Sequence, residues 1–545
     1  MKLVKSLLLG SAAGLCAVAG AQAADLPMRK AAPVEYVRVC TAHGAGFFYI
    51  PGTDTCLRVG GRARFEYQYT QQNTRNSSVS GYRGLGRLNI DARTSTPYGT
   101  LRAFVRFEIA SRTGGYLKSG TQERYFNAFP GFGPDTTREG QKYVDIDKAF
   151  VQFAGITAGR AQSFFDFYAG DVEFFGAGIY SNANTNLLAY TATFGGGFSA
   201  TISMEDPVYR RNPIFSQAST GPVGLTAGNA PQAQGGVNFV SGAIPLAFVG
   251  NAFIPGTTIP TSAIALDVGQ RGYLPDFVGA LRYDGAWGSA QAMAAVHEIR
   301  TGAYTGGAFS PIVGGAGVAG AAPIPDAAYG FAVGGGVKVN LPMLAPGDQI
   351  WLQGAYAQGA GSYTGVFNPP GQELNASGIT NRFTVNQVDA VIDNQGRLNL
   401  TESWSVMAAL LHYWTPEWRS AVFGTYGQVN YDPRLRTIAG GPAGITTTFT
   451  AAGAPAATSL AVNPNSSVLS SYDIFYGGGN LIWSPVRDLD IGVEVIYQRI
   501  WLPRTVADAN RGGTAAVSGV GIGGTGRGTS FDDNIMARLR VQRDF

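Results

Sequence analysis

The stretch LRVGGRARFEYQY, Leu57–Tyr69, decides the fold. Alternate side chains of a β-strand point to opposite faces, so this stretch has one apolar or aromatic face and one charged face. Phe65 and Tyr67 belong to the first face, and Arg62 and Glu66 belong to the second. At about 3.3 Å per residue the stretch is long enough to cross a bilayer even when it is tilted.

Repetition of this pattern separates a membrane strand from a soluble one, because a half-buried soluble strand also alternates. Arg87–Arg93 and Leu101–Ile109 repeat it, with arginines on one face and apolar side chains on the other. A soluble core tolerates few arginines on strand after strand, whereas a water-filled lumen inside a lipid-facing wall requires a polar face. We therefore expect an all-β protein that forms a transmembrane antiparallel β-barrel.

Composition agrees with a turn-rich β protein. Only 14% of the 545 residues are charged, against about 25% in ordinary globular proteins, and there are 76 glycines. The formal net charge is +4 and no basic cluster stands out, so nothing suggests a nucleic-acid partner. After the first residues no run of about 18 apolar residues occurs, so the sequence predicts no membrane-spanning helix.

The first 23 residues read as a secretory signal peptide. Lys2 and Lys5 form its positive region, Leu7–Val18 its apolar region, and Ala21-Gln22-Ala23 its cleavage site. A lipoprotein signal is the alternative, but the residue before Cys16 does not fit it. An exported protein without a spanning helix is periplasmic, secreted or an outer-membrane barrel.

Cys40 and Cys56 then remain in the mature chain, and an even pair in an oxidising compartment suggests a disulfide. Two buried free thiols are the alternative, and a metal site has only His43 nearby to support it. We accordingly divide the chain into the signal peptide (1–23), an N-terminal periplasmic segment with a disulfide-closed loop (24–55) and the barrel (56–545).

Sixteen strands are expected. They span residues 57–70, 84–95, 100–111, 143–154, 156–162, 183–195, 197–205, 275–284, 288–299, 327–340, 349–359, 403–414, 417–431, 471–484, 488–501 and 531–545. Short turns alternate with long connections, as in bacterial outer-membrane barrels with short periplasmic turns and long extracellular loops. Sixteen strands are enough to enclose an aqueous channel. The phase of the fourth strand changes near Lys148, which requires either a bulge or a different strand boundary. Asn381–Leu400 is a candidate for an additional loop hairpin.

The last strand, Phe531–Phe545, alternates in the same way as the first. We expect it to pair with Leu57–Tyr69, because closure removes both edges of the sheet.

The run VEYVRVCTAHGAGFFYIPGTDTCLRVGGRARFEY, Val34–Tyr67, resembles the start of mature porins from alphaproteobacteria, the Brucella and Rhizobiales outer-membrane porin family. The shared pattern is Val-Cys, a glycine-containing spacer, Phe-Tyr-Ile-Pro-Gly-Thr and Thr-Cys-Leu-Arg. The resemblance implies a general-diffusion porin that assembles as a homotrimer and whose third loop folds into the lumen. The terminal Phe545 agrees with it and is our candidate for the C-terminal assembly signal. The segment 206–274 is longer than the resemblance leads us to expect.

The third long connection is the candidate constriction loop, residues 163–182. Its acidic residues Asp166, Asp171 and Glu173 alternate with phenylalanines and tyrosines. We expect the aromatic side chains to anchor the loop against the wall and the three carboxylates to face the passage. The alternative is that these three are solvated loop charges.

A basic wall is expected opposite these carboxylates. Its candidate residues are Arg58, Arg62, Arg64, Arg87, Arg93, Arg102 and Arg106. Acids on one side and arginines on the other would create a transverse field that sets ion selectivity at short range. For any single arginine, the alternative is a wall position away from the narrow zone.

No catalytic, metal or cofactor site stands out. The histidines are isolated, and the glycine triplets at 334–336 and 477–479 lie inside expected strands, where glycine allows bends or close packing. Some outer-membrane enzymes are barrels too, but an enzyme would need an acid–base group beside a nucleophile.

The sequence therefore predicts passive diffusion of small hydrophilic solutes and ions across the outer membrane, with lipid around the barrel and no cofactor. A channel specific for a sugar or an anion is the first alternative, and a closed structural or adhesin-like barrel is the second.

Overall fold

A computed structural model describes residues 38–71, 79–114, 141–176, 178–212, 214–216, 237–240, 264–267, 270, 272–300, 326–367, 382–383, 385, 387–392, 397–435, 443–449, 455–462, 469–507 and 528–545. The expected signal peptide (1–23) lies outside the described residues. The chain forms two compact units, Met1–Arg58 and Val59–Phe545. The observed division thus falls three residues after the expected one.

A disulfide between Cys40 and Cys56 organises the N-terminal unit, as the sequence predicts. Both cysteines are buried with Phe47. A 3₁₀ turn, η2 (Thr41–His43), and a two-residue strand, β1 (Phe48–Tyr49), lie between them, and Phe48 pairs with Leu57. The alternative of two free thiols is therefore wrong.

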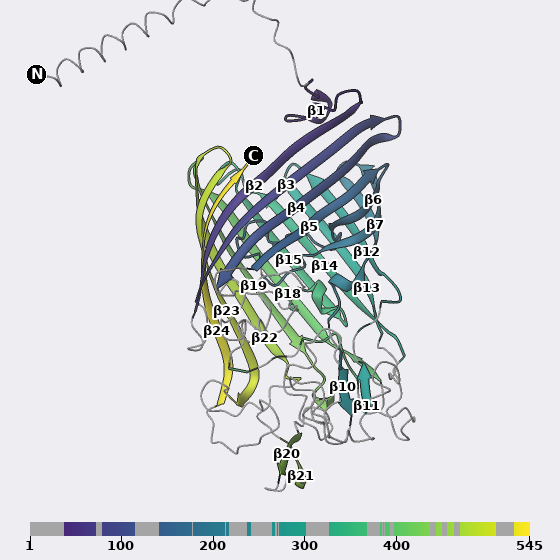
Figure 1. Cartoon of the computed structure of the whole chain (residues 1–545), viewed down its shortest axis with the longest axis vertical. Helices are drawn as coiled ribbons and strands as arrows, with labels where there is room; N and C mark the ends of the chain where they lie inside the picture. The colour runs from purple at the N-terminus through teal and green to yellow at the C-terminus, as the bar shows by residue number, and fades with distance from the viewer. Residues whose placement is uncertain are drawn as a thin grey trace, which may run out of the picture. The chain divides into compact units, whose positions relative to one another are not determined.

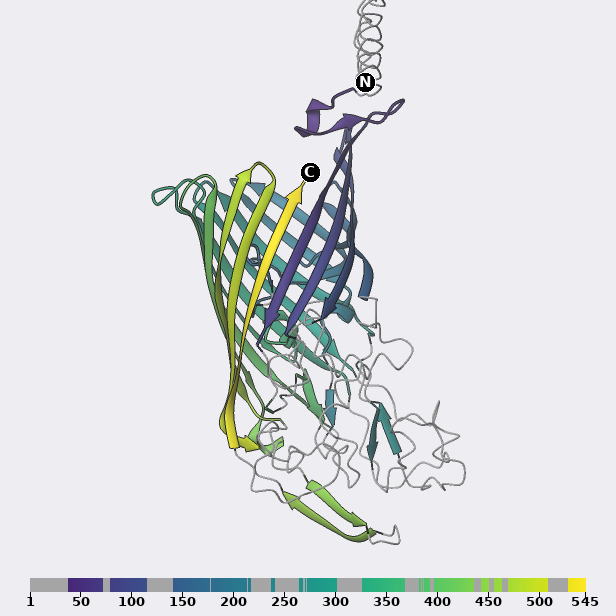
Figure 2. The ribbon, with the colours of Figure 1, turned by 60° about the vertical axis from the view of Figure 1, so that its left-hand side comes forward.

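The second unit is built on sixteen antiparallel strands of the described chain (Figure 1). They are β2 (Thr55–Thr70), β3 (Ser80–Thr96), β4 (Gly99–Gly114), β5 (Gln141–Phe153), β6 (Ile156–Gln162), β7 (Asn184–Gly195), β8 (Phe198–Glu205), β12 (Asp276–Gly285), β13 (Gly288–Ile299), β14 (Ala328–Asn340), β15 (Gln349–Gln358), β18 (Glu402–Tyr413), β19 (Trp418–Asn430), β22 (Tyr472–Val486), β23 (Leu489–Ala507) and β24 (Gly528–Asp544). Each strand pairs with its neighbours in this order, and β24 pairs with β2. The expected closed barrel is confirmed, and Figure 2 shows the purple β2 beside the yellow β24.

Short and long connections alternate around the ring. Hairpins as tight as Phe153–Ile156 and Gly285–Gly288 join the strands at one end, which we call the turn end. The first of these hairpins turns through Ala154 and Gly155, both with positive φ, the conformation that two-residue hairpin loops require. The other end, which we call the loop end, carries the long connections.

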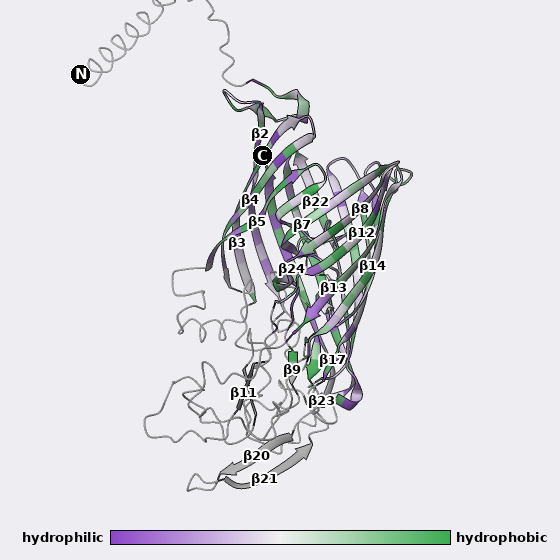
Figure 3. Cartoon of the chain, turned by 90° about the vertical axis from the view of Figure 1, so that its right-hand side faces the viewer, coloured by the Kyte–Doolittle hydropathy of each residue, from purple (hydrophilic) through white to green (hydrophobic). Residues whose placement is uncertain are grey.

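Alternation along the strands separates an outer face from an inner face. On β2, Phe65 is 45% exposed while its neighbour Glu66 is 0% exposed. On β24, Leu539 is exposed and Arg538 is buried. Figure 3 shows hydrophobic and hydrophilic residues interleaved along the barrel strands. The predicted arrangement, with apolar side chains outside and charged side chains inside, is confirmed.

Two irregularities that the sequence indicates are present. Between β4 and β5 the pairing passes from Arg106↔Lys148 to Phe107↔Ile146, so Asp147 is an extra residue that bulges from β5. In the 381–400 region, β16 (Ala390–Ile392) and β17 (Leu398–Leu400) form the candidate hairpin.

The remaining short elements lie in the long connections. They are η3 (Pro207–Tyr209), β9 (Ile214–Ser216), η7 (Gly361–Tyr363) and the two hairpins β10 (Val237–Val240) with β11 (Ile264–Asp267) and β20 (Ala443–Phe449) with β21 (Pro455–Val462). No helix within the described ranges is long and apolar enough to cross a membrane.

The junction of the first and last strands depends on Gly61. Gly61 and Phe545 exchange two backbone hydrogen bonds, and the Phe545 ring lies over the glycine. A Cβ atom at position 61 would overlap both that ring and the carbonyl oxygen of Arg87 on β3. A side chain here would therefore push apart the three strands that meet at the closure.

We predict that Gly61→Val impairs folding of the barrel, with a loss of stability on the order of 1–3 kcal/mol, typical of overpacking. Refolding into detergent micelles, read as the fraction of protein that keeps the compact, fast gel mobility without heating, measures the effect. Gly84→Val on β3 is the matched control, because a Cβ atom there meets nothing within 4 Å. Equal folding of the two variants would contradict this role of Gly61.

Candidate functional site

The connection between β6 and β7 crosses the inside of the barrel, and we call residues 163–182 the inward segment. Its backbone is held by side chains from the inner faces of seven strands of the described chain. Gln291 on β13 donates to the carbonyl oxygen of Phe164, and Gln353 on β15 accepts from the Tyr168 amide at 3.0 Å. Farther along, Thr425 on β19 accepts from the Ile179 amide. The third loop thus folds into the lumen, as the sequence predicts.

Aromatic side chains anchor the inward segment, which confirms the expectation. Phe165, Tyr168 and Tyr180 are each at most 1% exposed. Phe165 packs edge-on against Tyr363, and Tyr168 packs edge-on against Tyr180 and Trp351. Trp351 therefore points into the barrel.

The tip of the inward segment is clamped between two strands. The Glu494 carboxylate on β23 accepts from the amides of Phe174 and Phe175 at 2.7 and 2.8 Å. Arg538 and Arg540 on β24 donate to the carbonyl oxygen of Phe174 at 2.8 and 2.6 Å. Their guanidinium groups also lie over the rings of Phe175 and Phe174. The two backbone amides and the carbonyl oxygen of the tip therefore all have hydrogen-bond partners inside the barrel.

Of the three predicted acidic residues, two serve this anchoring and do not face the passage. Asp166 is buried, and its carboxylate accepts from Ser181 Oγ, the Ala183 amide and Arg210. Glu173 is also buried, and it accepts from the hydroxyl groups of Tyr168 and Tyr180, each at 3.0 Å. The expectation of three exposed carboxylates is therefore corrected for Asp166 and Glu173, because loop packing desolvates them.

Asp171 differs from the other two carboxylates. It is exposed, and among the described residues it has no ion-pair partner. Only this member of the acidic trio is thus available to solutes.

The predicted basic residues lie on the inner faces of β2, β3 and β4, with one exception. On β2, Arg62 pairs with Asp544, and Arg64 lies 3.6 Å from Glu66 and donates to Gln542. Arg87 on β3 pairs with Glu108, and Arg93 on β3 shares Asp91 with Arg102 on β4. Arg106 on β4 pairs with Asp147. Arg58 is exposed in the N-terminal unit, with its side chain beside Gly46. We call the six lumen arginines the basic wall.

Four charged residues outside the predicted basic set lie beside this wall: Glu66, Arg83, Arg538 and Arg540. Glu66 is 0% exposed and lies between Arg83 at 2.5 Å and Arg540 at 2.7 Å, with Arg538 at 3.9 Å. The wall thus carries more cations than anions around its buried glutamate. The period-two pattern of β3 and β24 was a signal that could have found these residues, because both strands place arginines on the inner face.

Residues from two further connections pack against the inward segment, and sequence reasoning did not identify them. Arg210, just after β8, is buried and donates to Asp166 at 2.9 Å. Tyr363 of η7 donates to Asp276 at 2.7 Å, and Asp276 in turn contacts His297. Gly365 lies so close to the backbone of Tyr180 that a Cβ atom would overlap it. The lumen is thus narrowed by several chain segments packed together.

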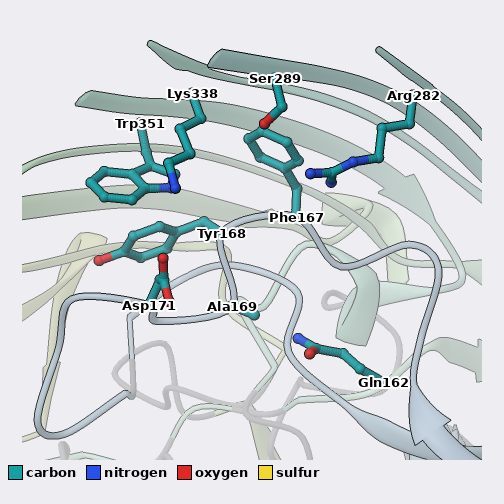
Figure 4. A pocket seen from close by; sticks show the side chains of 9 residues that line it. All are labelled: Gln162, Phe167, Tyr168, Ala169, Asp171, Arg282, Ser289, Lys338 and Trp351. Carbon is teal, nitrogen blue, oxygen red and sulfur yellow. The ribbon is translucent and has the colours of Figure 1, made fainter. Parts of the chain in front are cut away.

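A cavity of about 280 Å³ lies between the inward segment and the wall (Figure 4). Tyr168 and Asp171 line it from the segment, and Arg282, Lys338 and Trp351 line it from β12, β14 and β15. The part of the chain that the structure describes holds no group of three His, Cys, Asp or Glu residues that could bind a metal ion.

A closed barrel with an apolar exterior and a charged interior is the arrangement of transmembrane β-barrels of the bacterial outer membrane. Residues 25–516 match the protein family described as "Porin subfamily". This chain belongs to that porin family, and it resides in the outer membrane of a Gram-negative bacterium.

Several known proteins are similar to this chain. Porin Omp2b of Brucella canis and Porin Omp2b of Brucella abortus are each 33% identical over 307 residues, which is 54% of this chain and 66% of the relative. The matched part is thus slightly under two thirds of those relatives' own length. Among solved structures, the outer membrane channel DcaP of Acinetobacter baumannii is 12% identical, with a TM-score of 0.47 and coverage of 91% of this chain and 99% of that one.

We predict that Glu494→Ala loosens the tip of the inward segment. The amides of Phe174 and Phe175 would lose their acceptor, which costs about 1–3 kcal/mol for a buried group. Single channels in a planar bilayer should then show a larger and less steady conductance than the parent protein. Glu494→Gln keeps one acceptor oxygen and should lie between the two, and an unchanged conductance of Glu494→Ala would contradict the clamp.

We also predict that packing of the inward segment weakens at alkaline pH. Burial and the neighbouring Glu494 raise the pKa of Glu173 from 4.5 to about 8, although three tyrosine hydroxyl groups, including that of Tyr476, oppose the shift. The Glu173 carboxyl group therefore holds its proton more tightly when the inward segment is packed than when the segment is open to water. The stability of the packed segment accordingly falls as the pH rises from about 4.5 through about 8.

Current fluctuations recorded at pH 6 and pH 9 measure this dependence. We expect more frequent openings of the segment at pH 9 in the parent protein and a much smaller difference in Glu173→Gln, which cannot ionise. Equal pH dependence of the two proteins would assign the effect to other groups.

Proposed function

We propose that this protein is a passive diffusion channel for small hydrophilic solutes and ions across the outer membrane. The observation that carries the proposal is the charged inner face of a closed sixteen-strand barrel, of which Glu66 and Arg538 are examples. Barrels of this size enclose an aqueous channel, and a polar lining can hydrate a solute in transit. The short turns then face the periplasm and the long connections face the outside. The proposal assigns transport to the protein and no catalytic role or cofactor.

The filter in this proposal lies between the inward segment and the basic wall. Hydrogen bonds join the segment to β8, β13, β15, β19, β22, β23 and β24, and we take the inner faces of β2, β3 and β4 as the other side of the filter. Asp171 supplies an unpaired negative charge on one side, and the arginines supply a positive surplus on the other. Charged linings select ions by electrostatics at short range, where water screens them least.

Three further assignments come from the leader sequence and from the resemblance to the porin family. We propose a homotrimer, cleavage of the signal peptide after residue 23, and recognition of the terminal Phe545 during assembly. Phe545 is 69% exposed at the turn end, so its ring is accessible to an assembly factor. Cross-linking in detergent and N-terminal sequencing of the mature protein test the first two.

We predict that the purified protein conducts ions in planar bilayers and that Asp171→Asn alone shifts the reversal potential in a salt gradient towards anions. Asp166→Asn and Glu173→Gln should shift it much less, because those carboxylates are buried in the loop packing. Each variant should be measured at low and high salt, since screening reduces the contribution of an exposed charge.

Absence of any conductance in the parent protein would overturn the channel and favour a structural barrel. Conductance with an unchanged reversal potential in Asp171→Asn would keep the channel and remove Asp171 from its filter. Current that saturates with one solute alone would favour a substrate-specific channel.

A further inference from the structure

The cavity beside the inward segment lies on its turn-end side. Its wall residues Arg282, Ser289, Lys338 and Trp351 are all within three residues of the end of their strand at a short turn. Figure 4 shows these side chains reaching from the wall towards the segment that carries Tyr168 and Asp171. A solute that has passed the inward segment therefore meets this cavity before it leaves the barrel.

Two opposite charges in this cavity lack an ion-pair partner within the described part of the chain. Among the residues that the structure describes, neither Lys338 nor Asp171 takes part in an ion pair, although both line the same space. The third charge, Arg282, is already neutralised, because its guanidinium binds Asp284 at 2.9 Å and Gln291 at 3.2 Å. The cavity therefore offers one cation and one anion to a ligand.

The position of the Lys338 ammonium group is fixed by aromatic packing. Its Nζ atom lies 4.9 Å from the centre of the Trp351 ring, and that ring packs edge-on against Tyr168. Trp351 and Tyr168 are only 2% and 1% exposed, so they support the charge and present little apolar surface themselves. Fixing a flexible lysine in advance lowers the entropic cost of binding a carboxylate.

The cavity is small, and uncharged polar side chains line it beside the two charges. Gln162 and Ser289 also line the cavity, so hydrogen-bond donors and acceptors surround the two charges. The cavity volume of about 280 Å³ is just below the range of about 300–1,000 Å³ that is typical of ligand pockets. The ligand is accordingly small, hydrophilic and charged at both ends.

We propose that this cavity is a low-affinity subsite for small polar zwitterions, of the chemical class of free α-amino acids. The solute carboxylate binds Lys338, and the solute ammonium group binds Asp171. Gln162 and Ser289 then contact the polar remainder. This subsite rests on the proposed channel function and would make flux of such solutes saturable within an otherwise unselective pore.

Uptake of radiolabelled L-serine into liposomes that contain the full-length mature protein tests the subsite. We expect a saturable component at millimolar concentration, in addition to uptake of radiolabelled glucose that rises linearly. Lactate lacks the ammonium group and ethanolamine lacks the carboxylate, so each should compete at least threefold more weakly than unlabelled serine. Competition by lactate equal to that of serine would overturn the zwitterion and leave a simple anion site.

Two variants locate the subsite. Lys338→Gln and Asp171→Asn should each weaken half-saturation by serine at least threefold while glucose uptake stays linear. Arg419→Gln and Asp490→Asn are matched controls, because this ion pair lies outside both the cavity and the basic wall. Each variant removes one lumen charge and should leave half-saturation unchanged.

The outcomes separate this inference from the channel itself. Linear serine uptake together with glucose uptake would overturn the subsite and keep the channel. A half-saturation that moves equally in the controls and in Lys338→Gln would overturn the location of the subsite. No uptake of either solute would overturn the channel and the subsite with it.

Discussion

The buried clamp on the tip of the inward segment is the interaction on which the interior depends. A loop that enters a barrel carries its backbone amides and carbonyls away from bulk water, and each unpaired group would cost about 1–3 kcal/mol. Glu494 satisfies two consecutive amides, and Arg538 and Arg540 satisfy the carbonyl oxygen between them. The arginines are themselves balanced by Glu66, so the charge of the wall and the position of the loop form one network.

The fold could be predicted in detail from the sequence because one local rule repeats. Period-two alternation assigns each side chain to lipid or lumen, and membrane strands have no other way to hide their backbone groups than pairing in a ring. Arg87 and Arg102 therefore had to point inward once their strands were recognised. Even the bulge at Asp147 left a trace, because a single extra residue reverses the phase of the strand.

The partners inside the lumen could not be predicted, because they depend on register and on the path of loops. Arg62 meets Asp544 across 482 residues, and nothing local to either residue selects the other. Asp166 and Asp171 look alike in the sequence, yet Arg210 from a distant connection neutralises only the first.

Holding the loop and filtering ions place opposite demands on a carboxylate. A carboxylate that anchors must be desolvated and paired, and pairing converts a charge into a dipole whose field falls off steeply with distance. A carboxylate that filters must stay hydrated and unpaired, because only a net charge acts on an ion several ångströms away. The basic wall obeys the same logic, since Asp91 and Glu108 cancel much of the field of their arginines. The electric field in the lumen is therefore weaker than the number of arginines suggests. A few groups without an ion-pair partner among the described residues, such as Asp171 and Lys338, contribute a large share of the field that acts on a passing ion.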